Sequence, residues 1–371
     1  MADPKRNPDR NPGIDLMRAM AMFFVICLHL LGQGGLIAHA EPGSGKFYIL
    51  NLMQILSYCA VDAYGITTGY LMCTRTFRLS RVAKLWLTTV FWSVAVSCCF
   101  FAFVPASRNM EEMVSMFLPI LRGRYWFFTA YFVTMLVSPV LNVVIRTLSK
   151  TQFRLLLGAL FLIFGVAPVC ALGNDVLRIS GGCHFSWMIA LYLIGGYIRR
   201  FAGEEKKAER YLLGYFLFAL VHLVYVFATH VAGMGHYGSL MLTNVSPLIV
   251  GEAVCLFLYC RSAGGKIRAE GLGGRVIRFI TPGIYAVYVI HVHPKVFWSE
   301  EIIALFRPWD GRNVIWVLAA MVGAAAAVFV LCVLLDAVRQ PLFRVLGIDR
   351  AADRLSDMAE RKIRKLMSEE R

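Results

Sequence analysis

The sequence predicts an all-α membrane protein, a polytopic bundle of about ten transmembrane helices with both termini in the cytosol. The first observation is composition. The 371 residues are 58% hydrophobic and 16% charged, whereas soluble proteins average about 45–50% and about 25%. The second is the length of the apolar runs, and the third is the gathering of Lys and Arg between alternate runs.

Ten apolar runs are candidates for these helices, because about 20 mostly apolar residues cross a hydrocarbon core of about 30 Å. They are expected at residues 16–38, 48–72, 85–104, 125–145, 155–172, 184–199, 211–230, 242–260, 279–298 and 313–338. Barrel strands would alternate with period two over about 10 residues, but residues 319–335 are continuously apolar. A helical bundle therefore satisfies the backbone in lipid.

The positions of the charges predict the orientation. Of the 38 Lys and Arg, 30 lie in the N-terminal segment, in alternate connections and in the tail, and eight lie on the opposite side. This asymmetry places both termini in the cytosol. The first run has no cleavable signal pattern and is expected to stay in the protein. The net charge of +15 then faces the inner leaflet, and no nucleic-acid partner is expected.

Two units follow from this pattern, a membrane domain over residues 1–338 and a cytosolic tail over residues 339–371. Apolar residues recur among basic ones in the tail, which predicts an amphipathic helix on the anionic leaflet. Of the ten cysteines, Cys170 and Cys183 could form a disulfide on an oxidising outer side, or remain buried thiols. There is no CxxC pair, and no metal is expected.

Ionisable side chains inside apolar runs are costly and therefore indicate function. Arg18 and His29 are eleven residues apart on the first run, so they share one helix face about 16 Å apart. This suits a long ligand whose phosphates meet a cation at the cytosolic mouth while its reactive end reaches a histidine near mid-membrane. The alternative is that Arg18 is a positive-inside anchor and His29 a polar residue facing the bundle.

Asp62, deep in the second run, needs a partner. His29 on the neighbouring helix would serve, because an Asp–His pair fixes the imidazole tautomer and favours a general base. The rival interpretation is a structural bond from Asp62 to an arginine or the backbone. Arg75 and Arg78 follow the same run in a cluster larger than a membrane anchor needs, although the positive-inside pattern explains it more simply. Glu252 in a later run could pair with such an arginine or act as a second carboxylate.

Five motifs point to a known family. Asp15 directly precedes the first run, which holds Arg18 and His29, and the second run reads Val-Asp-Ala-Tyr over residues 61–64 and Thr-Gly-Tyr over 68–70. Residues 125–142, 192–197 and 284–291 supply the others. In this order, across residues 14–294, they resemble the acyltransferase-3 family of integral membrane acyltransferases, which includes O-acetyltransferases of bacterial surface polysaccharides. Gly65 and Thr68 depart from the family pattern, which affects only the packing around Asp62.

The resemblance implies a membrane acyltransferase domain over residues 1–338, in a bacterial cytoplasmic (inner) membrane. The donor would be an acyl-CoA, usually acetyl-CoA, that approaches from the cytosol. The acceptor would be a hydroxyl of a surface polysaccharide or a lipid-linked sugar. Membrane lipids are further expected partners, and a homodimer is left open.

The resemblance also assigns roles to the candidate residues near the donor. Arg18, with Arg75 or Arg78, would meet the CoA phosphates as cations. The pantetheine arm would run along the first helix and bring the thioester to His29. His29, held by Asp62, would take the proton from the acceptor hydroxyl or first accept the acyl group itself.

The acceptor is expected nearer the outer half. Tyr125, Trp126 and His291 fall there, and aromatic faces with a hydrogen-bonding imidazole suit a sugar. An aromatic belt at the membrane interface is the more usual cause of Tyr-Trp at a span end. Glu252 is grouped with these residues as a candidate for substrate binding.

Two other classes remain alternatives. A proton-coupled transporter or flippase of a glycolipid or small molecule would also use intramembrane His, Asp and Glu. It would favour broken spans at matching positions of two halves, and the sequence has no such symmetry. A membrane sensor or scaffold without chemistry would leave the shared face of Arg18 and His29 unexplained.

Overall fold

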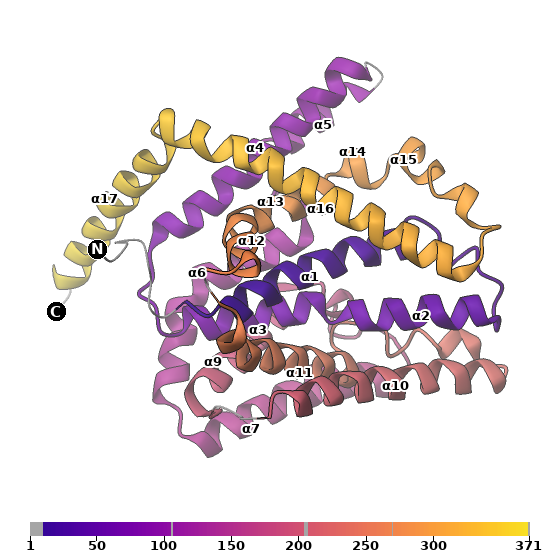
Figure 1. Ribbon diagram of the computed structural model, residues 1–371. Coiled ribbons are helices and arrows are strands. Elements are labelled where there is room, and N and C mark those ends of the chain that lie inside the picture. Colours follow the sequence, from indigo (N-terminus) through magenta and orange to yellow (C-terminus); the bar gives the residue numbers. More distant parts are fainter. Residues whose placement is uncertain (1–9, 105–106, 204–206, 269, 370–371) are drawn as a thin grey trace.

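The computed structural model describes residues 10–104, 107–203, 207–268 and 270–369, with side chains through residue 362, and contains no strand within these ranges. Figure 1 shows the helices packed side by side into one bundle. The all-helical class predicted from the sequence is confirmed. The basic residues of positions 1–9, which entered the charge argument, lie outside the described residues.

The described helices follow the predicted runs closely. In the first half they are α1 Pro12–Leu31, α2 Gly45–Tyr58, α3 Ala60–Met72, α4 Leu79–Phe103, α5 Met110–Ser115, α6 Trp126–Thr147, α7 Lys150–Phe161, a π-helical turn Leu162–Val166 and α8 Ala167–Cys170. In the second half they are α9 Phe185–Phe201, α10 Glu209–Val231, α11 Pro247–Ala263, α12 Leu272–Ile280, α13 Ile284–His291, α14 Pro294–Phe297, α15 Glu300–Ala304, α16 Val314–Val345 and α17 Ile348–Glu369. Short 3₁₀ turns lie at Ser180–Gly182, Gly235–Tyr237, Gly264–Lys266, Thr281–Gly283 and Arg307–Trp309.

Among the described residues, eight helical segments are long and apolar enough to cross a membrane, or nine if one bent pair counts as a span. The bent pair is Leu272–His291 with Pro294–Ala304, and it turns by 62°. The predicted count of ten is not confirmed. The difference is α9, whose 17 residues make a helix of about 26 Å at 1.5 Å per residue.

Helix α1 begins and ends at recognisable signals. The Asn11 side chain accepts a hydrogen bond from the Gly13 amide, and Pro12 stands in the first turn, two features that favour a helix start. The last residue of the helix is Leu31, followed by the C-cap Gly32, and Leu31 lies seven residues before the end of the predicted run 16–38. His29 therefore lies in the last turn of α1, and its predicted depth near mid-membrane stays a prediction.

Two glycines allow α3 and α9 to pack backbone against backbone. A Cβ added to Gly69 would lie 2.0 Å from the carbonyl oxygen of Tyr192, and one added to Gly195 would lie 2.1 Å from that of Ile66. Small residues permit such approaches between membrane helices. Both glycines lie in the motifs on which the family resemblance rests, so this part of the resemblance has a packing reason.

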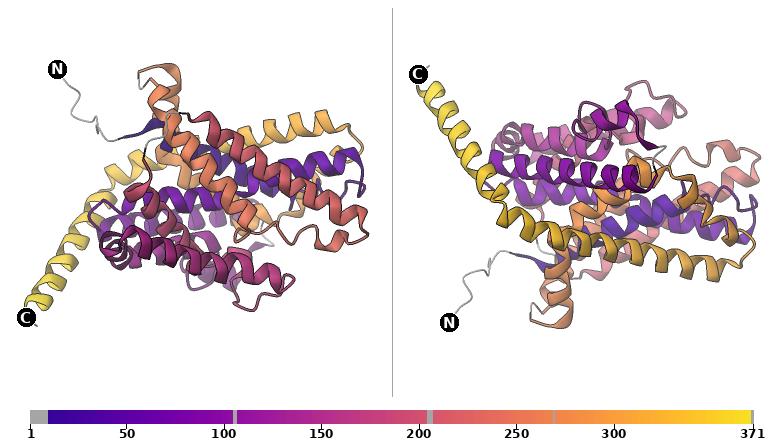
Figure 2. Two further views of the ribbon diagram at one scale, coloured as in Figure 1. Left: turned by 90° about the horizontal axis from the view of Figure 1, so that it is seen from below. Right: turned by 90° about the horizontal axis from the view of Figure 1, so that it is seen from above.

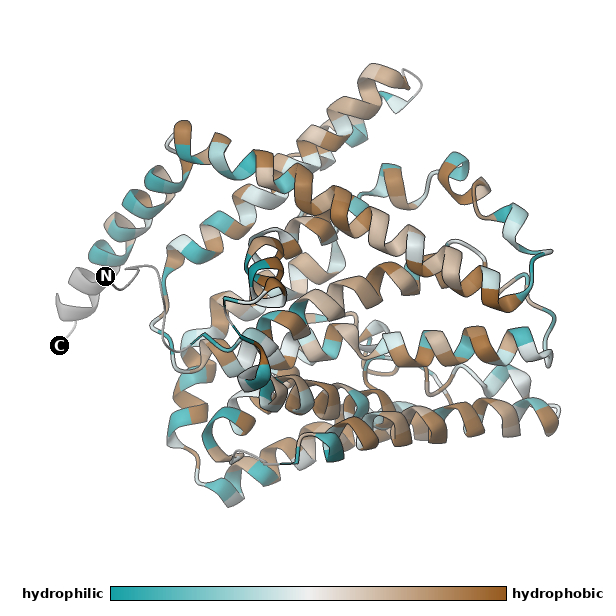
Figure 3. Ribbon diagram, in the orientation of Figure 1, coloured by the Kyte–Doolittle hydropathy of each residue, from teal (hydrophilic) through white to brown (hydrophobic). Residues whose placement is uncertain are grey.

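The first and last described helices border the same cavity at one end of the bundle. Asn11 and Ile14 line the same cavity as Asp357 and Glu360 of α17, and α17 projects from that end in the views of Figures 1 and 2. Figure 3 shows the bundle helices mostly brown and the described part of α17 largely teal. The assignment of this end to the cytosol stays a prediction. So does the domain boundary at residue 338, which falls inside α16.

Candidate active site

Two histidines from opposite ends of the chain meet in the bundle. Nδ1 of His29, in the last turn of α1, lies 3.1 Å from Nε2 of His291, at the end of α13. Nδ1 of His291 in turn bonds the carbonyl oxygen of Val287, one turn back on the same helix. The edge of Phe297 packs on the His29 ring, with centroids 4.7 Å apart.

These contacts determine the tautomers of neutral imidazoles. A carbonyl oxygen only accepts, so Nδ1 of His291 carries the hydrogen and Nε2 of His291 accepts. His29 must then donate from Nδ1, which leaves Nε2 of His29 with a lone pair. No described residue hydrogen-bonds that nitrogen. The pair thus orients His29 as a base or nucleophile, the task that a carboxylate performs in a catalytic triad.

His29 lines a cavity of about 520 Å³, referred to here as the His29 cavity. Its volume is in the usual range for ligand pockets. The predicted acceptor residues Tyr125 and Trp126 line it with His29, and so do several aromatic side chains that the sequence did not single out. These are Tyr58, Tyr64, Phe127, Tyr288, Phe297 and Trp298. His291 does not line the cavity and lies behind the lining residues His29 and Tyr288.

A second cavity, of about 990 Å³, lies at the end of the bundle where α1 begins and is referred to here as the basic cavity. Arg75 and Arg78, both predicted to meet phosphates, line it together with Arg81 and Arg199. Arg199 also donates a hydrogen bond to the hydroxyl of Tyr70, at 3.0 Å. The arginines predicted to follow the second run therefore line one cavity in the structure, and Arg199 of α9 is an additional arginine in its wall.

One face of α1 borders both cavities at its two ends. Ile14 lines the basic cavity, and the residues of α1 that line the His29 cavity are Ala21, Met22, Val25, Leu28 and His29. Arg18 lies on the same face of α1 between Ile14 and Ala21, about one helical turn from each. Its Nη2 donates to the hydroxyl of Tyr64 at 3.3 Å, and Tyr64 itself lines the His29 cavity. Arg18 and His29 thus share a face, as their spacing predicts.

Asp62 does not pair with His29, which corrects the predicted contact. Its Oδ1 accepts a hydrogen bond from the indole of Trp187 on α9 at 3.0 Å, and Oδ2 has no partner among the described residues. The reason is the helical period of about 100° per residue. Val61 and Tyr64 of α3 line the His29 cavity, which turns Asp62 toward α9.

Glu252 of α11 also lies away from both cavities. Its side chain is fully buried, and neither carboxyl oxygen has a partner in the described part of the chain. It lies within electrostatic range of Asp62. The structure therefore places Glu252 with Asp62 in the core, apart from the predicted acceptor residues.

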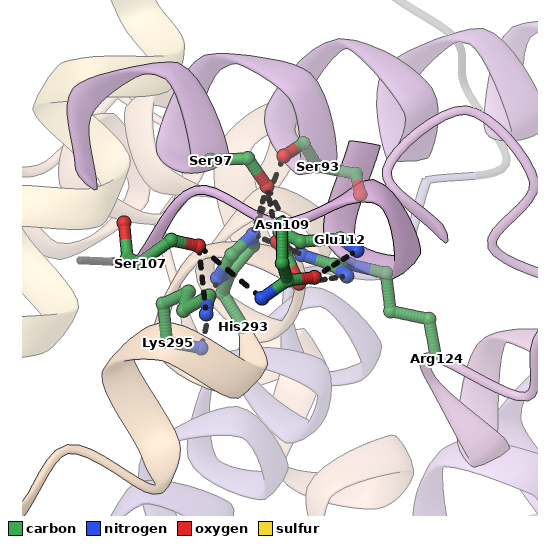
Figure 4. A network of polar contacts seen from close by, with 8 residues as sticks. All are labelled: Ser93, Ser97, Ser107, Asn109, Glu112, Arg124, His293 and Lys295. Atoms are coloured by element: carbon green, nitrogen blue, oxygen red, sulfur yellow. Dashed lines mark hydrogen bonds and ion pairs between the residues drawn. The ribbon is translucent and has the colours of Figure 1, made fainter. Parts of the chain in front are cut away.

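A buried ion pair between Arg124 and Glu112 (Figure 4) borders the His29 cavity, because Arg124 lines that cavity. Arg124, just before α6, donates to both carboxylate oxygens of Glu112 on α5, at 2.6 and 3.1 Å. Ser97 of α4 donates to the same carboxylate at 2.7 Å and lies 3.1 Å from Nε2 of His293. These four residues, the Glu112 network, connect α4, α5 and α6 to the bend between α13 and α14.

The network keeps its charge over the physiological range of pH. Burial tends to raise the pKa of the Glu112 carboxyl, but the hydrogen bonds from Arg124 and Ser97 outweigh it and lower the pKa to about 2. His293 lies two residues after His291, and Arg124 lines the His29 cavity. The network therefore braces both the chain that carries His291 and one wall of the cavity.

Sequence reasoning missed this network. Arg124 was counted only as a basic residue of the outer side, and Glu112 lies outside every predicted span. The signal available in the sequence was the second histidine of His-Val-His at residues 291–293. Its hydrogen-bond partners come from α4 and from Arg124 in the loop before α6, and a single sequence does not show such contacts.

The remaining predictions concern sulfur and metals. Cys170 and Cys183 are both free thiols in the structure, and Cys183 lines the His29 cavity. Within the residues that the structure describes, no group of three or more His, Cys, Asp and Glu side chains is arranged to hold a metal ion.

A comparison with protein families identifies the type of chain that builds this site. A family model described as an acyltransferase domain matches residues 11–336. The match covers both histidines, the face of α1 between the cavities, the four arginines of the basic cavity and the Glu112 network, and it stops before α17. Comparisons with curated proteins and with solved structures found no match.

Proposed function

The chain belongs to the acyltransferase-3 family of multi-pass membrane proteins, and on that premise we propose that it transfers an acetyl or related acyl group from acyl-CoA to a hydroxyl of a cell-surface glycan or lipid-linked saccharide. The observation that carries the proposal is the lone pair of His29 Nε2, oriented by His291 beside an aromatic cavity. A bacterial cytoplasmic membrane, with the basic cavity facing the cytosol, is the location we propose.

The basic cavity is the proposed entrance for the donor. Four arginines line it, and guanidinium groups bind phosphate oxygens in bidentate fashion. The face of α1 from Ile14 past Arg18 supplies a path for the pantetheine arm, because Arg18 and His29 are about 16 Å apart along the helix axis. The thioester would then lie beside His29, with its phosphates left at the entrance.

The proposed reaction uses His29 as a general base. Nε2 of His29 takes the proton of the acceptor hydroxyl while the hydroxyl oxygen attacks the thioester carbonyl carbon. The carbon–sulfur bond breaks, the imidazolium returns its proton to the CoA sulfur, and the products are the ester and free CoA. Nε2 of His291 accepts a hydrogen bond from Nδ1–H of His29 throughout the reaction, which stabilises the imidazolium as it forms. A transient acyl group on Nε2 is the second route open to the same nitrogen.

The His29 cavity is the proposed acceptor site. Its wall is rich in aromatic rings, including Tyr125 and Trp126, and sugars pack their C–H faces on such rings while polar tips supply hydrogen bonds. Asn244 and Gln54 add amide groups to the wall. We propose that His291 orients His29 through their hydrogen bond and does not contact the sugar, which the residues lining the cavity bind.

The test is acyl transfer by the purified protein in lipid nanodiscs. Acetyl-CoA labelled in the acetyl group is supplied with a surface-glycan acceptor, and the ester is measured by mass spectrometry. His29→Ala is expected to lower the rate by about 10²–10⁴-fold, with CoA affinity within a few-fold of wild type. His222→Leu is the matched control, because His222 is a buried imidazole that does not line the His29 cavity. Full transfer by His29→Ala would remove His29 from catalysis.

A further inference from the structure

The C-terminal helix forms one wall of the basic cavity. Asp357 and Glu360 of α17 line it together with Arg75, Arg78 and Arg81. Helix α17 is held there by α4, since Lys84 of α4 lies 2.8 Å from the Asp353 carboxylate of α17. A cavity proposed to receive phosphates is therefore bordered by two carboxylates of the same chain.

Glu360 is bound at a site built for an anion. Its Oε1 accepts a hydrogen bond of 2.8 Å from the backbone amide of Leu79, the first residue of the 25-residue helix α4. The N-cap residue of α4 is Arg78, and no side chain of its own caps the helix. The unsatisfied amides and the positive end of a helix dipole favour an anion at this point.

The surroundings strengthen this preference. Three arginines, Arg75, Arg78 and Arg81, precede or open α4 and line the cavity beside that amide. Helix starts with adjacent cations are common phosphate sites in proteins. The Glu360 carboxylate thus occupies the position that a phosphate oxygen would take, on a helix that lies outside the matched family domain.

We propose that the start of α4 is a phosphate subsite of the basic cavity, which Glu360 fills at rest and a phosphate of the acyl-CoA donor takes over by displacing α17. The inference rests on the proposed donor. Binding of CoA then exchanges a single carboxylate for a phosphate ester of higher charge and frees α17 from the entrance. The C-terminal helix would act as an intrinsic competitor of the donor.

A lipid headgroup could supply the same phosphate chemistry, because the entrance lies at the proposed membrane surface. The donor is favoured by the position of the cavity. Its wall includes Ile14 of α1 and Tyr70 of α3, so it extends into the bundle toward the face of α1 that leads to His29. A lipid headgroup bound at the rim of the bundle would not occupy the part of the cavity that Ile14 and Tyr70 line.

The experiment measures CoA affinity of the full-length protein in nanodiscs of zwitterionic lipid. Glu360→Gln retains an amide oxygen that can cap Leu79 but removes the competing charge. It is expected to lower the Kd for CoA about two- to five-fold, the usual range for one charge near a helix terminus. Asp349→Asn is the matched control, because it makes the same charge change on α17 outside the cavity and is expected to leave the Kd unchanged.

A second measurement follows α17 itself. Hydrogen exchange of the backbone amides in residues 348–362 is expected to rise at saturating CoA and to stay unchanged with pantetheine, which has no phosphate. Equal CoA affinity in wild type and Glu360→Gln, together with unchanged exchange, would overturn the inference while leaving the donor site intact. Release of α17 by phosphatidylglycerol nanodiscs alone, with no response to CoA, would assign the subsite to lipid and also overturn it. Absence of CoA binding in every variant would instead contradict the proposed function.

Discussion

Nδ1 of His29 lies 3.1 Å from Nε2 of His291, although 262 positions separate the two residues in the chain. The contact joins the first helix of the bundle to the chain just before the 62° bend between Leu272–His291 and Pro294–Ala304. It replaces the carboxylate partner that the sequence suggested for His29. The first prediction concerns this contact.

Removal of the His291 imidazole should slow catalysis without loss of donor binding. In His291→Leu, Nδ1 of His29 loses its acceptor and the productive tautomer is no longer favoured. We expect kcat to fall about 10²-fold, with KM for acetyl-CoA within a few-fold. His291→Gln, which retains an acceptor and a donor, should recover part of the rate. A wild-type kcat in His291→Leu would show that the pair does not orient the base.

Asp62→Asn should leave kcat within about three-fold of wild type, because the carboxyl faces Trp187 and not His29. The substitution keeps an oxygen for the indole and removes the desolvation cost of a buried charge. We therefore expect unchanged or higher thermal stability. The measurement is kcat together with the unfolding temperature of the same preparation. A loss as large as that of His29→Ala, in a folded protein, would restore Asp62 to the catalytic residues.

The Glu112 network should contribute to stability above the ordinary pKa of a glutamate and lose that contribution in acid. Because the pKa of Glu112 is lowered to about 2 in the folded protein, the folded state binds fewer protons than the unfolded state between about pH 4.5 and 2. Stability should therefore fall across that window as pH decreases. Unfolding temperatures measured from pH 7 to 2 test this.

The matched variant for that measurement is Glu112→Gln, which leaves Arg124 buried without its ion-pair partner. We expect lower stability at pH 7, by about 3–5 kcal/mol if the pair is broken cleanly, and a flatter acid limb. An acid limb identical to that of wild type would assign the pH dependence to other carboxylates.

Arg78→Ala should weaken CoA binding, with a larger effect at low ionic strength. The guanidinium lines the basic cavity, and salt screens its attraction for phosphate over about 10 Å at 0.1 M. The matched control is Arg154→Ala, since Arg154 belongs to the same predicted side but does not line the cavity. The Kd at two salt concentrations distinguishes them. Equal responses of the two variants would remove Arg78 from donor binding.

Gly195→Ala should destabilise the bundle without touching either cavity. The added Cβ would lie 2.1 Å from the Ile66 carbonyl oxygen, so α3 and α9 must separate, at a cost of about 1–3 kcal/mol. Gly158→Ala, where nothing lies within 4 Å of the added atom, should be neutral or stabilising. Thermal unfolding of the two variants in the same detergent gives the comparison.

The helical class, the positions of most spans and the shared face of Arg18 and His29 were predictable from the sequence. These depend on local properties, namely the length of apolar runs and a rotation of about 100° per residue. The cationic cluster of Arg75 and Arg78 followed from the same kind of reasoning, because its residues are neighbours in the chain.

Tertiary structure alone decided which side chains meet. The choice between Asp62 and His291 as the partner of His29 depended on how α1, α3 and α13 rotate against one another, and each residue is a plausible partner by chemistry. The Glu112 network and the approach of Glu360 to α4 likewise join segments far apart in the chain, and no sequence pattern pairs one segment with the other. Helix periodicity determines which face of a helix a residue occupies. Which helix packs against that face depends on tertiary contacts between segments far apart in the chain.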